Sequence, residues 1–112
     1  MTISLNKGDI VIVCLDPTIG SEINKTRPAV IVSNNIGNKF SARVIVAPLT
    51  SNVDKIFPFQ VLINNDFIIP SKILLDQIRT IDKQRIIKKL GSVSTEKLHE
   101  IDKAIKIVFD IK

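Results

Sequence analysis

Apolar residues in this chain occur in short runs separated by polar turns, and this spacing limits the folds that it can adopt. Runs of this length, apolar throughout or alternating with polar residues, are typical of strands. They cover residues 10–15, 29–32, 44–47 and 59–63, and longer strand-like segments follow at 72–82 and 86–94. Short strands joined by polar turns, such as the turn predicted at 34–41, indicate a small barrel or curled sheet.

The last part of the chain changes to helical spacing. Leu98, Ile101, Ile105, Val108 and Phe109 recur at the i, i+3, i+4 and i+7 positions of one helix face. A serine or threonine at 94–95 is suited to cap the start of this helix. We therefore predict one mostly β domain with α (α+β) over residues 1–112: a small curled β-barrel followed by an amphipathic C-terminal helix.

Composition excludes several classes of function. The chain is 45% hydrophobic, which is enough for a core without metals or disulfides. Phenylalanine is the only aromatic residue type, and this argues against folds that stack many RNA bases on an aromatic sheet. His99 is the single histidine and is expected on the helix surface, so neither a Ser-His-Asp triad nor a His/Cys metal site is expected. No phosphate-binding glycine loop is present, and we expect no cofactor.

Cellular context and partner class follow from cysteine usage and charge. Cys14 is the only cysteine, so we expect a buried, reduced thiol and a cytoplasmic protein. No apolar stretch is long enough to cross a bilayer, and the first residues lack a signal-peptide pattern. A net charge of +5 suits a nucleic acid, an anionic membrane or an acidic protein as partner. The charge can also reflect a lysine-rich genome composition and have no role in binding.

Arg27 stands in the segment "EINKTRPAVIVSNN", between a polar loop at 16–26 and a predicted buried strand. Pro28 and the strand fix the backbone after Arg27, which suits a guanidinium held toward a ligand. A second polar loop at 49–58 contains Thr50. These residue types suit RNA cleavage by the 2′-hydroxyl of the substrate itself, because the enzyme then needs only to align the strand and neutralise charge on the phosphoryl oxygens. A guanidinium and a threonine hydroxyl both donate to such oxygens.

The same residues also have purely structural interpretations. Arg27 is equally suited to an ion pair with Glu22 or Asp16. Thr50 fits a turn hydroxyl that bonds to its own backbone. From residue types and spacing alone, both interpretations remain open.

Four segments in register, "KGDIVIVCLDPTIGSE", "KTRPAVIVSNN", "VIVAPLTS" and "ILLDQIRTIDKQRI", resemble the MazF/PemK/Kid family of bacterial toxins. The resemblance extends from Lys7 to the C-terminal helix. It implies an SH3-like, PemK-type barrel, a homodimer, and a metal-independent endoribonuclease that cleaves single-stranded RNA, chiefly mRNA. The products would be a 2′,3′-cyclic phosphate and a 5′-hydroxyl. The resemblance also implies an acidic, MazE-like antitoxin bound across the RNA-binding surface, and no membrane partner.

The resemblance assigns a role to each matching position. It implies that Arg27 of "TRPAV" and Thr50 of "PLTS" are catalytic. Some branches of the family use an aspartate or histidine near the arginine as the general base, and neither loop here contains a histidine. Our candidate base is Glu22, the only carboxylate of the "GSE...TRP" loop besides Asp16. The implied RNA contacts are Ser21, Asn34, Gln77 and Arg79. For Arg79 an ion pair at a subunit interface is the second interpretation. Gln77 and Arg79 share a strand face by their spacing, as many solvated pairs also do.

Two functions other than RNA cleavage remain open. A CcdB-like protein shares the barrel, poisons DNA gyrase and cleaves nothing. A catalytically inactive module would bind only RNA or the antitoxin. Both Arg27 and Thr50 are present, which favours an active ribonuclease.

Overall fold

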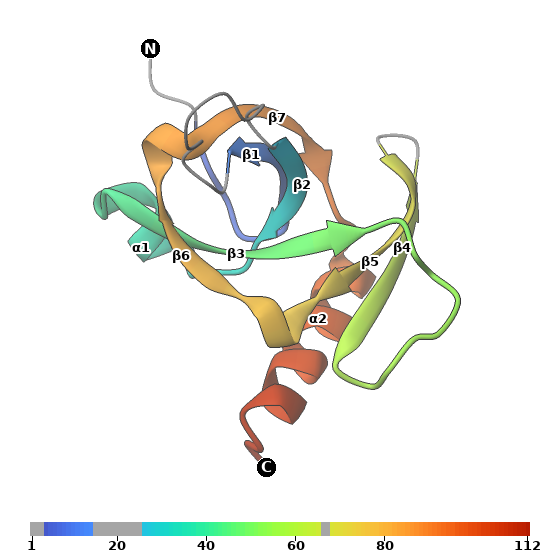
Figure 1. Cartoon of the computed structure of the whole chain (residues 1–112). Coiled ribbons are helices and arrows are strands. Elements are labelled where there is room, and N and C mark those ends of the chain that lie inside the picture. Colours follow the sequence, from blue (N-terminus) through green and yellow to red (C-terminus); the bar gives the residue numbers. More distant parts are fainter. Residues whose placement is uncertain (1–3, 15–25, 66–67) are drawn as a thin grey trace, which may run out of the picture.

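The computed structural model describes residues 4–14, 26–65 and 68–112, and most of them lie in strands (Figure 1). The strands are β1 (Asp9–Cys14), β2 (Thr26–Ile31), β3 (Arg43–Thr50), β4 (Gln60–Asn65), β5 (Ile68–Leu74), β6 (Arg79–Asp82) and β7 (Ile86–Ser92). The helices are α1 (Asn35–Phe40), α2 (Thr95–Val108) and the short 3₁₀ helices η1 (Leu75–Gln77) and η2 (Lys83–Arg85).

The strands form one antiparallel, seven-stranded sheet that curls on itself. Its order is β4-β5-β3-β2-β1-β7, and β6 pairs with β3 outside this path. β7 pairs with β1, β6 pairs with β3, and η2 joins β6 to β7 along the chain, so these strands and β2 form a ring (Figure 1). β4 and β5 extend the sheet from the end of β3, and α2 packs against β4 and η1 (Figure 1). The predicted α+β fold, a small curled β-barrel with a C-terminal helix, is confirmed.

Two hydrophobic cores lie on opposite faces of the curled strands. The barrel core fills the ring and contains Leu5, Val11, Val13, Ala29, Ile31, Val44, Val46 and Ile81. The helix-side core lies between the sheet and α2 and contains Ile10, Val30, Val32, Ala47, Leu49, Val61, Ile63, Ile73, Leu75, Val93, Ile101 and Ala104. Alternate residues of β2 therefore enter different cores, which explains its uninterrupted apolar run: a strand buried on both faces has no polar side.

α2 begins at the predicted cap. The Ser94 side chain accepts a hydrogen bond from the backbone N–H of Lys97, which satisfies one of the unpaired donors of the first turn. Ile101 is fully buried in the helix-side core, and most of the predicted apolar face packs there with it. Phe109 was predicted on this face, and that prediction is wrong. It is the C-cap residue with 55% of its surface exposed, because the helix has ended before it.

The segment predicted as a turn at 34–41 is instead the short helix α1. The Asn34 side chain caps it by accepting a hydrogen bond from the backbone N–H of Gly37. Asn38, only 2% exposed, anchors the helix, since its side-chain amide donates to the carbonyl oxygen of Ser33 at 2.9 Å. The segment contains three asparagines and a glycine, which are ordinary turn residues, so composition alone indicated a turn.

The predicted strand 72–82 is interrupted by η1. β5 and β6 pair with the same edge of β3, through Ile73 opposite Leu49 and Arg79 opposite Val46. Between these two pairs the β5–β6 chain advances twice as far as β3, and η1 takes up the excess. The break in the ladder also explains why β3 continues through Pro48, where we predicted an end. Proline has no N–H to donate, and it is tolerated where ladder bonding is interrupted.

Two other residues singled out from the sequence have clear positions. His99 is exposed on α2, as predicted. Cys14 was predicted to be buried but is half-buried, because it is the last residue of β1. Its carbonyl oxygen accepts a hydrogen bond from Nη1 of Arg85 at 3.2 Å.

Candidate active site

Arg27 and Thr50 lie at the same end of two neighbouring strands. The register of β2 and β3 ends with Ala29 opposite Pro48, and Arg27 lies two residues before Ala29 while Thr50 lies two residues after Pro48. Directly opposite residues in an antiparallel pair project from the same face. By the period of two, both side chains continue the rows that fill the barrel core, at the point where those rows reach the surface. The strand pairing thus places two predicted site residues, 23 positions apart in the sequence, at the same end of neighbouring strands.

Arg27 is an exposed cation on a rigid strand. We predicted Arg27 just before a strand that begins at Ala29, but it belongs to β2 itself, and its backbone pairs with Val13 of β1. The residues that follow Pro28 are fully buried, which fixes the strand that carries the guanidinium. No carboxylate in the described part of the chain forms an ion pair with Arg27, and the predicted partners Asp16 and Glu22 lie outside the described residues.

The Thr50 hydroxyl has the turn role predicted for it, while its catalytic role stays a prediction. Its oxygen accepts a hydrogen bond from the backbone N–H of Asn52 at 3.2 Å, which is the turn interaction expected after Pro48. A hydroxyl has one donor and two acceptor sites, so accepting this bond leaves the proton available for a ligand. The turn bond fixes the oxygen atom and thereby limits the directions in which that proton can point.

Lys72 is a further candidate residue that the sequence analysis did not identify. β5 pairs with the end of β3 so that Lys72 lies opposite Thr50, on the other side from Arg27. Arg27, Thr50 and Lys72 therefore lie at one end of β2, β3 and β5, and we call these three residues the row. The Lys72 ammonium donates to the carbonyl oxygen of Lys55 at 2.7 Å, which holds it near the segment that follows β3. Nothing in the local sequence marked this lysine, because its position depends on a pairing between distant strands.

The other predicted RNA contacts occupy different places. Gln77 is exposed in η1, which contacts β3, and Arg79 is the exposed first residue of β6, opposite Val46. Both lie along the edge of β3 away from β2. Asn34 lies beyond the opposite end of β2 from Arg27, where its side chain caps α1. Ser21 and Glu22 lie outside the described residues. The roles of all these residues stay predictions.

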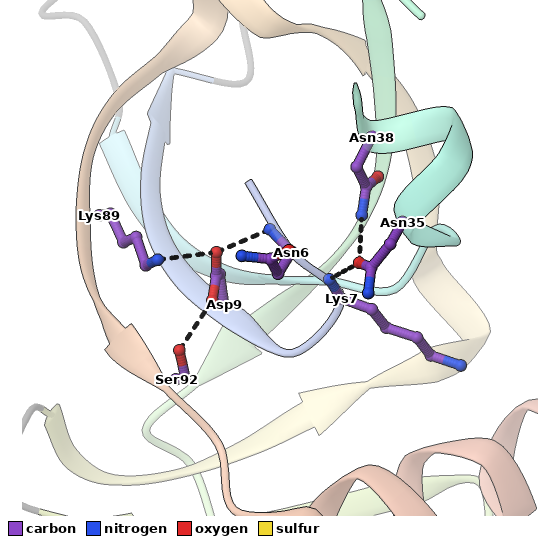
Figure 2. Close-up of polar contacts among 7 residues, drawn as sticks. All are labelled: Asn6, Lys7, Asp9, Asn35, Asn38, Lys89 and Ser92. Carbon is purple, nitrogen blue, oxygen red and sulfur yellow. Dashed lines mark hydrogen bonds and ion pairs between the residues drawn. The ribbon is translucent and has the colours of Figure 1, made fainter. Parts of the chain in front are cut away.

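A second polar cluster lies at the start of β1, away from Arg27, and its contacts stabilise the fold (Figure 2). The carboxylate of Asp9, 2% exposed, accepts hydrogen bonds from the backbone N–H of Asn6 at 2.8 Å and the hydroxyl of Ser92 at 2.7 Å, and forms an ion pair with Lys89 at 3.1 Å. Beside it, the backbone N–H of Lys7 donates to the side chain of Asn35. These contacts join β1 to β7 and α1, at the end of β1 away from Arg27.

Replacing Asp9 with alanine should lower the free energy of unfolding by about 2–3 kcal/mol, because buried donors lose a charged acceptor. Urea denaturation of both proteins measures this difference. Asp102→Ala is the matched control. Asp102 pairs with the Lys7 ammonium at 2.6 Å, but its side chain is 48% exposed, so its loss should cost less than about 1 kcal/mol. Equal losses in the two variants would show that the Asp9 contacts contribute no more than a surface ion pair.

Two negative findings concern only the described residues. Across residues 4–14, 26–65 and 68–112, no three His, Cys, Asp or Glu side chains are grouped to hold a metal ion. None of the helices within these ranges has the length and apolar composition needed to cross a membrane.

Comparison with known proteins gives a consistent result. Residues 6–109 match the model of a family described as PemK-like, MazF-like toxins of type II toxin–antitoxin systems. Endoribonuclease MazF9 of Mycobacterium tuberculosis is 38% identical, over 96% of this chain and 98% of that protein. Endoribonuclease EndoA of Bacillus subtilis is 39% identical, over 92% of each chain.

Solved structures confirm the fold. A MazE–MazF crystal structure from Deinococcus radiodurans superposes with a TM-score of 0.84 at 21% identity, covering 99% of this chain and 100% of that one. A mycobacterial endoribonuclease in complex with its cognate antitoxin superposes with a TM-score of 0.80 at 22% identity, covering 96% and 97% of the two chains.

Proposed function

Because the chain belongs to the PemK-like, MazF-like toxins of type II toxin–antitoxin systems, we propose that it is an endoribonuclease that cleaves single-stranded RNA, chiefly mRNA. Relatives that are 38% and 39% identical carry the name endoribonuclease and match along nearly their whole length. The observation that carries the proposal is the row of Arg27, Thr50 and Lys72, which gathers two cations and a hydroxyl from three neighbouring strands.

In the proposed reaction the substrate supplies its own nucleophile. The ribose 2′-oxygen attacks the adjacent phosphorus, the bond from phosphorus to the 5′-oxygen breaks, and the products are a 2′,3′-cyclic phosphate and a 5′-hydroxyl. The proton of the 2′-hydroxyl leaves to a base, for which Glu22 is the candidate, and the leaving 5′-oxygen takes up a proton. The chain contributes alignment and charge stabilisation, and the proposed step uses no metal ion.

Each residue of the row has a distinct task in this proposal. The Arg27 guanidinium donates two parallel hydrogen bonds to the phosphoryl oxygens, where negative charge increases in the transition state. The Thr50 hydroxyl donates to the same group of oxygens. Lys72 adds a second positive charge on the other side of Thr50 and is suited to a neighbouring phosphate. The strands hold these groups in place before substrate arrives, so little reorganisation accompanies the reaction.

The proposed partners follow from charge and family. Structures related to this chain were crystallised with a MazE antitoxin or a cognate antitoxin. We propose that an acidic antitoxin of this kind binds the chain and covers the row of Arg27, since a net charge of +5 suits a polyanionic peptide as well as RNA. Assembly as a homodimer belongs to the same proposal and rests on the resemblance to the family.

The proposal is tested by incubating the purified protein with a long unstructured RNA in EDTA and mapping the new ends. We expect discrete cuts that leave 2′,3′-cyclic phosphates and 5′-hydroxyls, at a rate that EDTA does not change. Intact RNA would favour the gyrase poison or the inactive binding module, and inhibition of DNA supercoiling by gyrase would distinguish these two. Cuts that stop in EDTA, or that leave 5′-phosphates, would contradict the proposed chemistry.

A further inference from the structure

The segment that follows Thr50 carries two aromatic rings packed face to face. The ring centroids of Phe57 and Phe59 are 5.5 Å apart and their planes differ by 9°, which is an offset-stacked pair. Phe57 is 40% exposed although it is a large apolar residue. The segment 51–59 joins β3 to β4 and projects outward from the sheet (Figure 1). A stacked pair open to solvent is a surface on which another flat ring can continue the stack.

A chain of contacts connects this pair to Lys72 of the row. Lys72 lies opposite Thr50, and its ammonium donates to the carbonyl oxygen of Lys55 at 2.7 Å. The Lys55 ammonium in turn lies 4.9 Å from the centroid of the Phe57 ring. Lys72 therefore connects the end of β3 to Lys55, and the Lys55 ammonium lies over the exposed ring of Phe57.

The backbone holds Phe57 in a fixed position. Its N–H donates to the side-chain oxygen of Gln60 at 3.1 Å, and its carbonyl oxygen accepts from the backbone N–H of Gln60 at 2.9 Å. Pro58 lies between these residues and restricts the backbone further. Gln60 is the first residue of β4, so the ring is attached to the sheet through a closed turn. A ligand that stacks on Phe57 would meet a surface that is already ordered.

We propose that Phe57 and Phe59 form a stacking platform for one base of the RNA strand that binds at the row, and that Lys55 moves from the ring to a backbone phosphate when the base binds. This inference rests on the proposed function and adds a positioning residue to it. Stacking of a base on an aromatic side chain strengthens binding by about 5- to 150-fold. An exposed contact between a cation and a ring contributes only about two- to fivefold, so a base displaces the exposed Lys55 side chain.

Binding to two uncleavable oligomers tests the platform. The first is a fluorescent 12-nucleotide oligomer of 2′-O-methyladenosine, in which the nucleophile is blocked, and the second has the same backbone without its central bases. We expect the wild-type protein to bind the first oligomer about tenfold more tightly or better, and Phe57→Leu to lose at least fivefold of that preference. Phe57→Tyr, which keeps the ring, should retain it. With cleavable RNA, Phe57→Leu should raise KM more than it lowers kcat.

Phe40→Leu is the matched control, because Phe40 is also an exposed ring, with the Lys39 ammonium 5.4 Å from its centroid, but lies on α1. It should keep the wild-type preference for bases. A Phe57→Leu protein that keeps this preference, or a Phe40→Leu protein that loses it equally, would overturn the platform. The proposed function fails separately: a wild-type protein that binds the base-containing oligomer through Phe57 but cuts no RNA would overturn the endoribonuclease and leave the platform standing.

Discussion

Replacing Arg27 with alanine should lower kcat for RNA cleavage by about 10³-fold, since one preorganised donor to a developing oxyanion contributes about 10²–10³ and a transferred phosphoryl group can depend on an arginine still more. The expected loss lies mainly in kcat, because the guanidinium interacts most strongly with charge that appears only in the transition state. Single-turnover cleavage of one short RNA, at several protein concentrations, separates this effect from a loss of binding. The kcat of Arg27→Lys should lie between those of the wild-type protein and Arg27→Ala, since an ammonium keeps the charge but not the paired donors.

Arg43→Ala is the control for the loss of one surface arginine. Arg43 is exposed and begins β3, the strand that ends at Thr50, so it lies at the far end from Arg27. Its removal should leave kcat within about twofold, with some loss of RNA affinity from the lower net charge. If Arg27→Ala cleaves at the rate of Arg43→Ala, Arg27 has no catalytic role and the proposed site is wrong.

Of the substitutions considered, Ile101→Ala should lower the free energy of unfolding most, by about 2–5 kcal/mol. The shorter side chain leaves a cavity in the helix-side core. Ile101 is fully buried between α2 and the sheet. For a domain of this size, each kcal/mol corresponds to a decrease of about 4–8 °C in Tm. Urea denaturation at 25 °C gives the free energy directly, and an unchanged m-value would show that the unfolded state is the same.

Ile107→Ala on the same helix controls for helix propensity. Ile107 is 50% exposed, and alanine favours the helix over isoleucine by a few tenths of a kcal/mol. We expect this variant to remain within about 0.5 kcal/mol of the wild-type protein. A similar loss in both variants would mean that α2 does not depend on the buried contact of Ile101.

Burial periodicity made much of the fold predictable from the sequence. β2 appears as an unbroken apolar run because Val30 faces one core while Ala29 and Ile31 face the other. α2 was predictable through Ser94 and the spacing of its buried residues, both of which are local properties of the chain. The family resemblance depended on whole segments in register, and it singled out Arg27 and Thr50, which lie at the same end of the paired strands β2 and β3.

Features that depend on contacts between distant segments were not predictable in this way. Lys72 belongs to the row only because β5 pairs with the end of β3. Asn38 turns a loop-like segment into α1 through its buried bonds to Ser33, which no propensity scale contains. The position of Phe57 follows from bonds to Gln60 and from a lysine bound across strands. In each case, a tertiary contact decides what a local pattern leaves open.

The central position of β3, between β2 on one edge and β5 and β6 on the other, has a consequence for how such a toxin can be inhibited. β2 binds one edge of this strand, β6 and β5 bind the other, and its side chains enter both cores. Local melting of the strand that carries Thr50 would therefore break most of the molecule, at a cost close to that of complete unfolding. An inhibitor that acts by distorting this strand would have to supply that free energy. An inhibitor that only covers the row would not have to supply this free energy. Covering the row is therefore the less costly way to inhibit the folded protein.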